Sequence, residues 1–123
     1  MTKIELIKSH DVDIAVISGD ERVITDVSSA LDLMTRVKYE TGAARIAIDK
    51  SLVCEDFFIL STGLAGEVLQ KFINYHVKAA FYGDYTRYTS KPLRDFIYES
   101  NSGHDFFFVS TREEAIETLG GAR

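Results

Sequence analysis

The sequence predicts an α/β domain with a mixed sheet of about five strands and four helices mainly on one face of that sheet. Two observations predict this class. Short segments with alternating apolar residues recur along the chain, and segments with apolar residues three and four positions apart separate the later ones. The first two strand segments have no helix between them, so the sheet should open with a hairpin and continue with parallel strands joined by crossovers.

Alternation of apolar and polar residues defines the strands. Ile4 and Leu6 alternate with charged residues in the first strand, and the turn residues 10–13 lead directly into the second. The predicted strands, in order, are residues 3–8, 14–18, 45–49, 77–82 and 105–109. A loop that carries Cys54 and two phenylalanines is expected after the third strand.

Helical spacing of apolar residues defines the helices. The predicted helices are residues 26–40, residues 62–75, a third with Pro92 in its first turn and Gly103 beyond its end, and a short fourth through Leu119. Their ends carry recognisable residues: Thr25 or Asp26 before the first, Gly42 after it, Ser61 or Thr62 before the second, a capping box at Ser110 or Thr111 before the fourth, and Gly120 and Gly121 after it.

These patterns also predict a core and leave one face of the sheet open to two interpretations. The residues expected to be buried are Leu31, Met34, Ile46, Ile48, Leu64, Val68, Phe72, Phe81, Phe96 and Phe108. Ala80, Tyr82 and Phe107 point to the other face. That face is either a surface for a homodimer or another partner, or is covered by terminal segments of the chain.

Composition narrows the class of protein. The chain has 123 residues, of which 46% are apolar, and this length and composition predict one domain over residues 1–123. The 14 Lys and Arg residues against 19 Asp and Glu residues give a net charge of -5, which argues against a nucleic-acid partner. No apolar run is long enough to cross a bilayer and no signal-peptide core is found, so a cytoplasmic location and no membrane partner are expected. With Cys54 as the single cysteine and no phosphate-binding glycine loop, no metal and no cofactor are predicted.

One short motif points to a function. Residues 60–66 read Leu-Ser-Thr-Gly-Leu-Ala-Gly and come directly before the second predicted helix. This segment resembles the Asp-Ser-Ser/Thr-Gly-Leu-Gly signature of STAS domains, the family of sulphate transporters and anti-sigma-factor antagonists. Leu60 stands where that family has aspartate, and Ala65 replaces a glycine. The resemblance implies a sequential sheet with helices mainly on one face, and it implies that a partner kinase phosphorylates Ser61.

A second resemblance covers nearly the whole chain. The segments that carry it are residues 54–58, residues 62–67, residues 70–72 and residues 89–101. They are similar to recurring segments of the bacterial family of domains of unknown function numbered 4180. This resemblance implies a fold but carries no activity.

The first functional hypothesis is a non-enzymatic regulatory module that binds another protein. Ser61 is its candidate phospho-acceptor, and Thr62 and the flanking loop form its candidate partner surface. The competing structural interpretation is that Ser61 only caps the second helix.

The alternative hypothesis is a domain that binds a small anionic ligand, or a small enzyme, at the loop and helix start over residues 84–94. Such a loop follows the carboxyl end of a strand, where α/β sheets commonly bind ligands. Basic residues suit an anion and tyrosines stack on a ring. The candidate binding residues are Asp84, Tyr85, Arg87, Tyr88, Ser90, Lys91 and Arg94. The competing structural interpretation is a surface whose charges neutralise one another.

Overall fold

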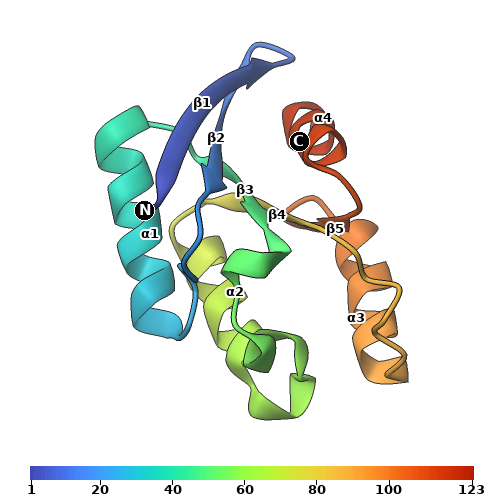
Figure 1. Ribbon diagram of the computed structural model, residues 1–123. Coiled ribbons are helices and arrows are strands. Elements are labelled where there is room, and N and C mark those ends of the chain that lie inside the picture. The colour runs from blue at the N-terminus through green and yellow to red at the C-terminus, as the bar shows by residue number, and fades with distance from the viewer.

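The computed structural model describes residues 1–123 and contains one mixed sheet of five strands, which Figure 1 shows with its helices. The strands lie in the order of the sequence, β1-β2-β3-β4-β5. They are β1 (Lys3–Ser9), β2 (Val12–Ser18), β3 (Arg45–Asp49), β4 (Lys78–Tyr82) and β5 (Phe106–Val109). The first pair is antiparallel and the other three pairs are parallel, with Ile48 opposite Phe81. The predicted hairpin and parallel strands are therefore confirmed.

Three helices connect the parallel strands and cover one face of the sheet. They are α1 (Val27–Thr41), α2 (Leu64–Asn74) and α3 (Lys91–Asn101). Because crossovers between parallel neighbours share one handedness, a sheet that grows in one direction receives all of them on the same face. Alternate strand residues such as Ile46, Ile48 and Phe81 pack against these helices in a core of 23 buried residues.

The fourth helix, α4 (Arg112–Gly121), follows the last strand and covers the opposite face. Figure 1 shows α4 on one side of the sheet with α2 and α3 on the other. Ala115 and Leu119 pack on Ala80 and Phe107 within a cluster of 7 buried residues. Of the two interpretations of this face, coverage by a terminal segment is the observed one. Ala80 and Phe107 are thus closed to a second copy of the chain.

The predicted core is buried in the structure. Seven of the ten expected residues are buried, and Leu31, Leu64 and Phe96 are partly buried against the same core. Phe81 stacks on Phe108 with ring centroids 5.3 Å apart. Helical and strand periodicity therefore located the interior of this fold correctly.

Two helix boundaries differ from the prediction. Residues 50–62 contain three short 3₁₀ turns, η1 (Lys50–Leu52), η2 (Glu55–Phe58) and η3 (Leu60–Thr62), and α2 begins only at Leu64. At the other end of the chain α4 includes Gly120 and does not end before it. A side chain at Gly120 would lie 2.7 Å from Cβ of Ser9, so glycine lets α4 approach the β1–β2 hairpin.

Candidate functional site

The turn segment, residues 55–62, is fixed by buried aromatic side chains and by hydrogen bonds to its own backbone. Phe57 and Phe58 are buried in the core, with ring centroids 5.1 Å apart. The hydroxyl of Thr62 donates to the carbonyl oxygens of Asp56, at 2.8 Å, and Ile59, at 2.9 Å. These contacts fix the backbone of a segment that has neither strand nor α-helix geometry.

The prediction that Ser61 or Thr62 serves as the N-cap of the second helix is wrong. Gly63 occupies that position with φ of 78°, and no side chain caps the helix from there. The hydroxyl of Thr62 instead accepts from the backbone amide of Leu64 at 3.2 Å, and Ser61 lies exposed in the middle of η3. Glycine takes the left-handed conformation readily, so the chain turns at Gly63 before the helix begins.

The exposed side of the turn segment combines an apolar and a hydroxyl side chain. Ile59 is 49% exposed, and the Ser61 side chain faces solvent two residues later. Glu55, Asp56 and Glu67 are exposed on the same stretch of chain. The exposed charged residues of the turn segment and of the first turn of α2 are therefore all acidic.

The loop after β4 packs directly on the turn segment. The ring of Phe58 lies 6.0 Å from that of Tyr85 and 5.4 Å from that of Tyr88, and the two tyrosines are 5.9 Å apart. The hydroxyl of Tyr88 donates to the carboxylate of Glu55 at 3.3 Å. The structure thus places the loop after β4 against the turn segment, so parts of the two candidate sites are in contact.

Lys50 covers this aromatic cluster, and sequence reasoning did not anticipate it. Its Nζ lies 4.7 Å from the ring centroid of Tyr88 and 5.8 Å from those of Phe58 and Tyr85. A side chain at Gly83, which has φ of 154°, would lie 2.8 Å from Cβ of Lys50. The signal in the sequence was the pair of a lysine just after β3 and a glycine just after β4, since parallel strands end at the same edge of a sheet.

The two tyrosines are structural elements of this edge. Tyr85 donates from its hydroxyl to the carbonyl oxygen of Phe81 at 2.9 Å, and burial strongly raises its pKa, with smaller effects of Tyr88 and Asp49. Their rings are occupied by one another, by Phe58 and by Lys50. Stacking of these rings on a ligand stays a prediction.

The polar residues of the loop divide into engaged and free groups. Asp84 accepts from the amide and the hydroxyl of Thr86, and these bonds, with Arg87 and Lys50 nearby, lower the pKa of its carboxyl group. Lys91 is paired with Asp95 at 2.7 Å.

The free group lies at and before the start of α3. Ser90 precedes the helix without capping it by its side chain. Arg87 and Arg94 are exposed. Of the cations predicted to meet an anion, these two arginines are therefore free of ion pairs and Lys91 is not.

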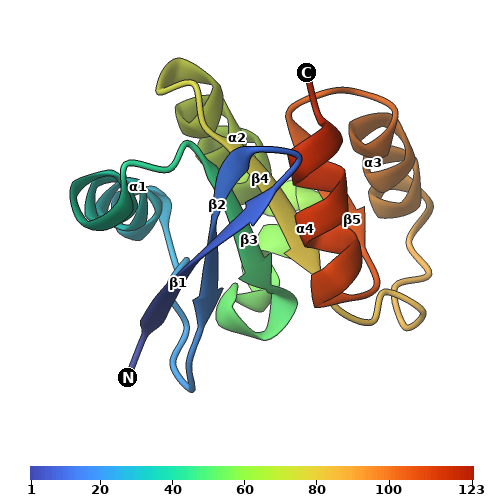
Figure 2. The same cartoon turned by 90° about the horizontal axis from the view of Figure 1, so that it is seen from above.

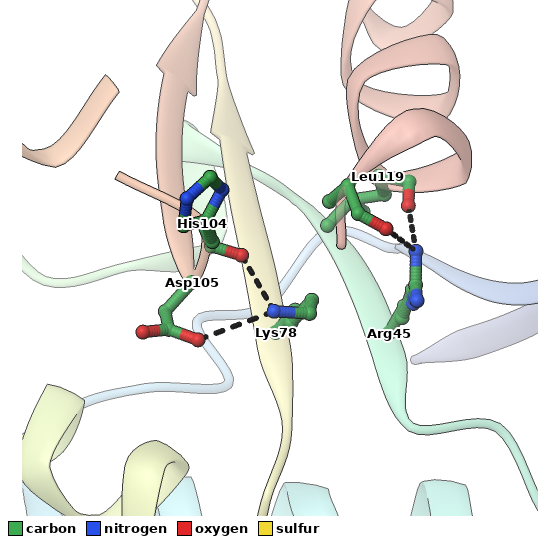
Figure 3. A network of polar contacts seen from close by, with 6 residues as sticks. Arg45, Lys78, His104, Asp105 and Leu119 are labelled. Atoms are coloured by element: carbon green, nitrogen blue, oxygen red, sulfur yellow. Dashed lines mark hydrogen bonds and ion pairs between the residues drawn. The ribbon is translucent and has the colours of Figure 1, made fainter. Parts of the chain in front are cut away.

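At the opposite end of the parallel strands, where β3 and β4 begin, the charged side chains make hydrogen bonds within the fold (Figure 3). Arg45 and Lys78 are neighbours across β3 and β4. Lys78 donates to the carbonyl oxygen of His104 at 2.7 Å and to Asp105 at 3.2 Å. Arg45 donates to the carbonyl oxygens of Leu119 and Ala122, which end α4. Both cations at this end are therefore used to hold the fold together.

One of three comparisons with known proteins gives a match. A family model described as Domain of unknown function (DUF4180) matches residues 9–119. No curated protein and no solved structure gives a match. None of the helices has the length and apolar character needed to span a membrane, and no group of three or more metal-ligating side chains is found.

Proposed function

The chain belongs to the DUF4180 family of domains of unknown function, and from this premise we propose that it is a non-enzymatic regulatory module that binds another protein through the turn segment. The observation that carries the proposal is the contrast within that segment. Its buried side is fixed by Phe57, Phe58 and Thr62, and its outer side presents Ile59 and Ser61 to solvent.

A fixed surface segment is well suited to binding. Ordering a flexible loop on association costs free energy, and a segment that is already ordered avoids this cost. Exposed Ile59 supplies an apolar contact, and the Ser61 hydroxyl supplies a donor and an acceptor of hydrogen bonds. The partner proposed here is a protein with an apolar recess for Ile59.

Phosphorylation of Ser61 is the proposed control. A kinase would transfer the γ-phosphoryl group of ATP to Oγ of Ser61, which loses its proton, and ADP would leave. The phosphate adds about two negative charges to a segment whose exposed charged residues, Glu55 and Asp56, are already acidic. A partner that recognises the unmodified turn segment is then repelled. The sequential strand order and the one-sided crossover helices are the architecture that the resemblance to STAS domains implies, which supports this comparison.

The test compares four variants in partner capture from cells of the source organism, followed by direct binding to the captured protein. Ile59→Asp and Ser61→Asp should lose the partner. Ser61→Ala should bind it only slightly more weakly, because it removes one neutral hydrogen-bonding group. The control Ser28→Asp, at an exposed serine of α1, should bind it unchanged. Mass spectrometry of the native protein should find phosphate on Ser61. If Ile59→Asp and Ser61→Asp both bind like the wild type while remaining folded, the proposal is wrong.

A second candidate function, binding of a small anion, is supported by one specific observation. The ammonium group of Lys50 lies against aromatic rings, and exposed Arg87 follows in the adjacent loop. Both cations lie close enough to Asp84 to lower the pKa of its carboxyl group. Titration with inorganic phosphate, followed by amide NMR shifts, tests this candidate. Saturable shifts in residues 83–94 that disappear in Arg87→Glu and Arg94→Glu would favour it over the first.

A further inference from the structure

An apolar cavity opens between α1 and the end of α2, on the side of the sheet that carries the crossover helices. Its volume is about 480 Å³. Its apolar lining includes Leu31 and Met34 of α1, the buried Ile46 of β3, and Val77, just before β4. Its volume falls in the range of roughly 300 to 1,000 Å³ that is typical of sites for small molecules.

The cavity exists because the connection from α1 to β3 is made of small residues. Gly42, Ala43 and Ala44 line it and fill little space. At its mouth stand two large aromatic residues, Tyr39, which is 90% exposed, and Tyr75, which is 62% exposed. Apolar walls without a neighbour lose the dispersion contacts that a filled core provides. An apolar ligand between these walls would restore them.

The charge of the side chains that line the cavity favours an anionic ligand over a cationic one. Lys38 lines the cavity and takes part in none of the ion pairs of the molecule, whereas Arg36 on the same helix is paired with Glu40 at 2.6 Å. No acidic residue lines the cavity. The one formal charge at this site is therefore an unpaired cation.

We propose that this cavity binds a small amphiphilic anion, which has an aliphatic or aromatic body and a carboxylate at one end. The body lies against the apolar lining residues Leu31, Met34 and Val77, and the carboxylate faces Lys38. This site is separate from the turn segment, and the proposal stands independently of the proposed function.

The experiment is an amide NMR titration of the full chain with decanoate, decanol and decylamine, with the two charged probes kept below their micelle concentrations and decanol below its solubility limit. These probes share one chain length and differ in the charge of the head group. The expected result is saturable shifts at Met34, Ala43, Ile46 and Val77, with decanoate binding more tightly than decanol and decylamine binding most weakly. Shifts spread over the whole surface, or equal binding of decanoate and decylamine, would overturn the proposal.

Variants test the position of the ligand. Ala44→Trp, at an exposed residue that lines the cavity, should weaken decanoate binding about tenfold or more because the indole occupies the space. Lys38→Gln should weaken it about two- to fivefold, as expected for an exposed ion pair. The matched control Lys3→Gln removes an exposed lysine of β1 and should leave binding unchanged.

Two further readouts distinguish a ligand site from a purely structural role of Lys38 and from a dimer surface. Lys38 lies in the last turn of α1, where a cation favours the helix dipole, so Lys38→Gln also lowers stability slightly. That structural role predicts the same loss of affinity for decanol as for decanoate, and such a result would contradict the proposal. Sedimentation that shows a dimer which Ala44→Trp dissociates would assign the cavity to a second copy of the chain instead.

Discussion

The two faces of the sheet are covered in different ways. On one face, three helices and the turn segment enclose 23 buried residues, among them six phenylalanines. On the other, covered by the single helix α4, only 7 residues are buried, and three of these are alanines (Figure 2). The same strands supply both faces, since successive side chains of a strand point to opposite sides.

This difference shows that a helix with a small apolar contact area, α4, is also held by polar contacts. The face covered by three helices, called the large face below, is stabilised by buried apolar area and by aromatic pairs such as Phe81 with Phe108. The face covered by α4, called the small face below, has additional polar contacts at the two ends of that helix. Arg45 binds the carbonyl oxygens at its carboxyl end, and Arg112 in its first turn is paired with Glu5 of β1 at 2.9 Å. We expect α4 to be a separate unit of local stability.

The largest effect is expected on the large face. Phe72→Ala removes a fully buried ring of α2 and should lower the free energy of unfolding by about 3 to 5 kcal/mol. Denaturant unfolding followed by circular dichroism measures this loss, which should appear as one cooperative transition. A loss below about 1 kcal/mol would mean that the three-helix core is not the main source of stability.

A smaller and more local effect is expected on the other face. Leu119→Ala removes the largest buried side chain of α4 and should cost about 2 to 3 kcal/mol. Hydrogen exchange should accelerate in α4 more than in α2. Equal acceleration in both helices would show that the two faces open as one unit.

The polar contribution to the small face is tested by Arg45→Met, which keeps most of the apolar side chain. It leaves the carbonyl oxygens of Leu119 and Ala122 without their donor and should cost about 1 to 3 kcal/mol. The Arg45→Lys side chain can reach at most one of these two carbonyl oxygens well. Its free energy of unfolding should therefore lie between those of the wild type and Arg45→Met. If Arg45→Met melts at the same temperature as the wild type, this contact does not stabilise α4.

The smallest effect concerns alkaline pH and compares one tyrosine from each face. Burial raises the pKa of Tyr85, on the large face, and raises that of Tyr82, on the small face, where Asp49 adds to the shift. Above the ordinary tyrosine pKa of about 10 the unfolded chain loses these protons while the folded chain retains them, so stability should fall as pH rises.

Denaturant midpoints measured between pH 8 and pH 11 should therefore decrease for the wild type. Tyr85→Phe should flatten this decrease, although it also loses the hydrogen bond to Phe81 and starts from a lower stability. Tyr82→Phe should flatten it less, because Tyr82 is less buried. A wild-type protein with no alkaline decrease would contradict the direction of both pKa shifts.

Much of the fold could be predicted because its signals are local. Ile46 and Ile48 alternate with Arg45, Ala47 and Asp49, so the period of a strand is visible in the sequence. Val68 and Phe72 are four residues apart, which is the period of a helix. The 3₁₀ turns over residues 50–62 have no such period. Thr62 before a glycine looks like a helix cap, and only the left-handed conformation of Gly63 displaces the helix start. Coverage of the second face by α4 depends on contacts far apart in sequence, such as Leu119 on the sheet.

The candidate site was less accessible to prediction for a similar reason. Tyr85 and Tyr88 were identified as aromatic loop residues, but the ring of Phe58 and the ammonium of Lys50 that occupy them come from other segments. The cavity beside α1 is a space between elements. Only the run of small residues at 42–44 and the tyrosines at two helix ends hinted at it.

The sequential order of the strands has a consequence for the synthesis of the chain. A nascent polypeptide emerges from its amino end, so all five strands and three crossover helices are made before α4. Until α4 emerges, the strip that contains Ile14, Val16 and Phe107 has no cover, and exposed apolar strips promote aggregation. A ribosome that stalls before Arg112 would thus release a product with an uncovered sheet, which chaperones and proteases recognise as incomplete.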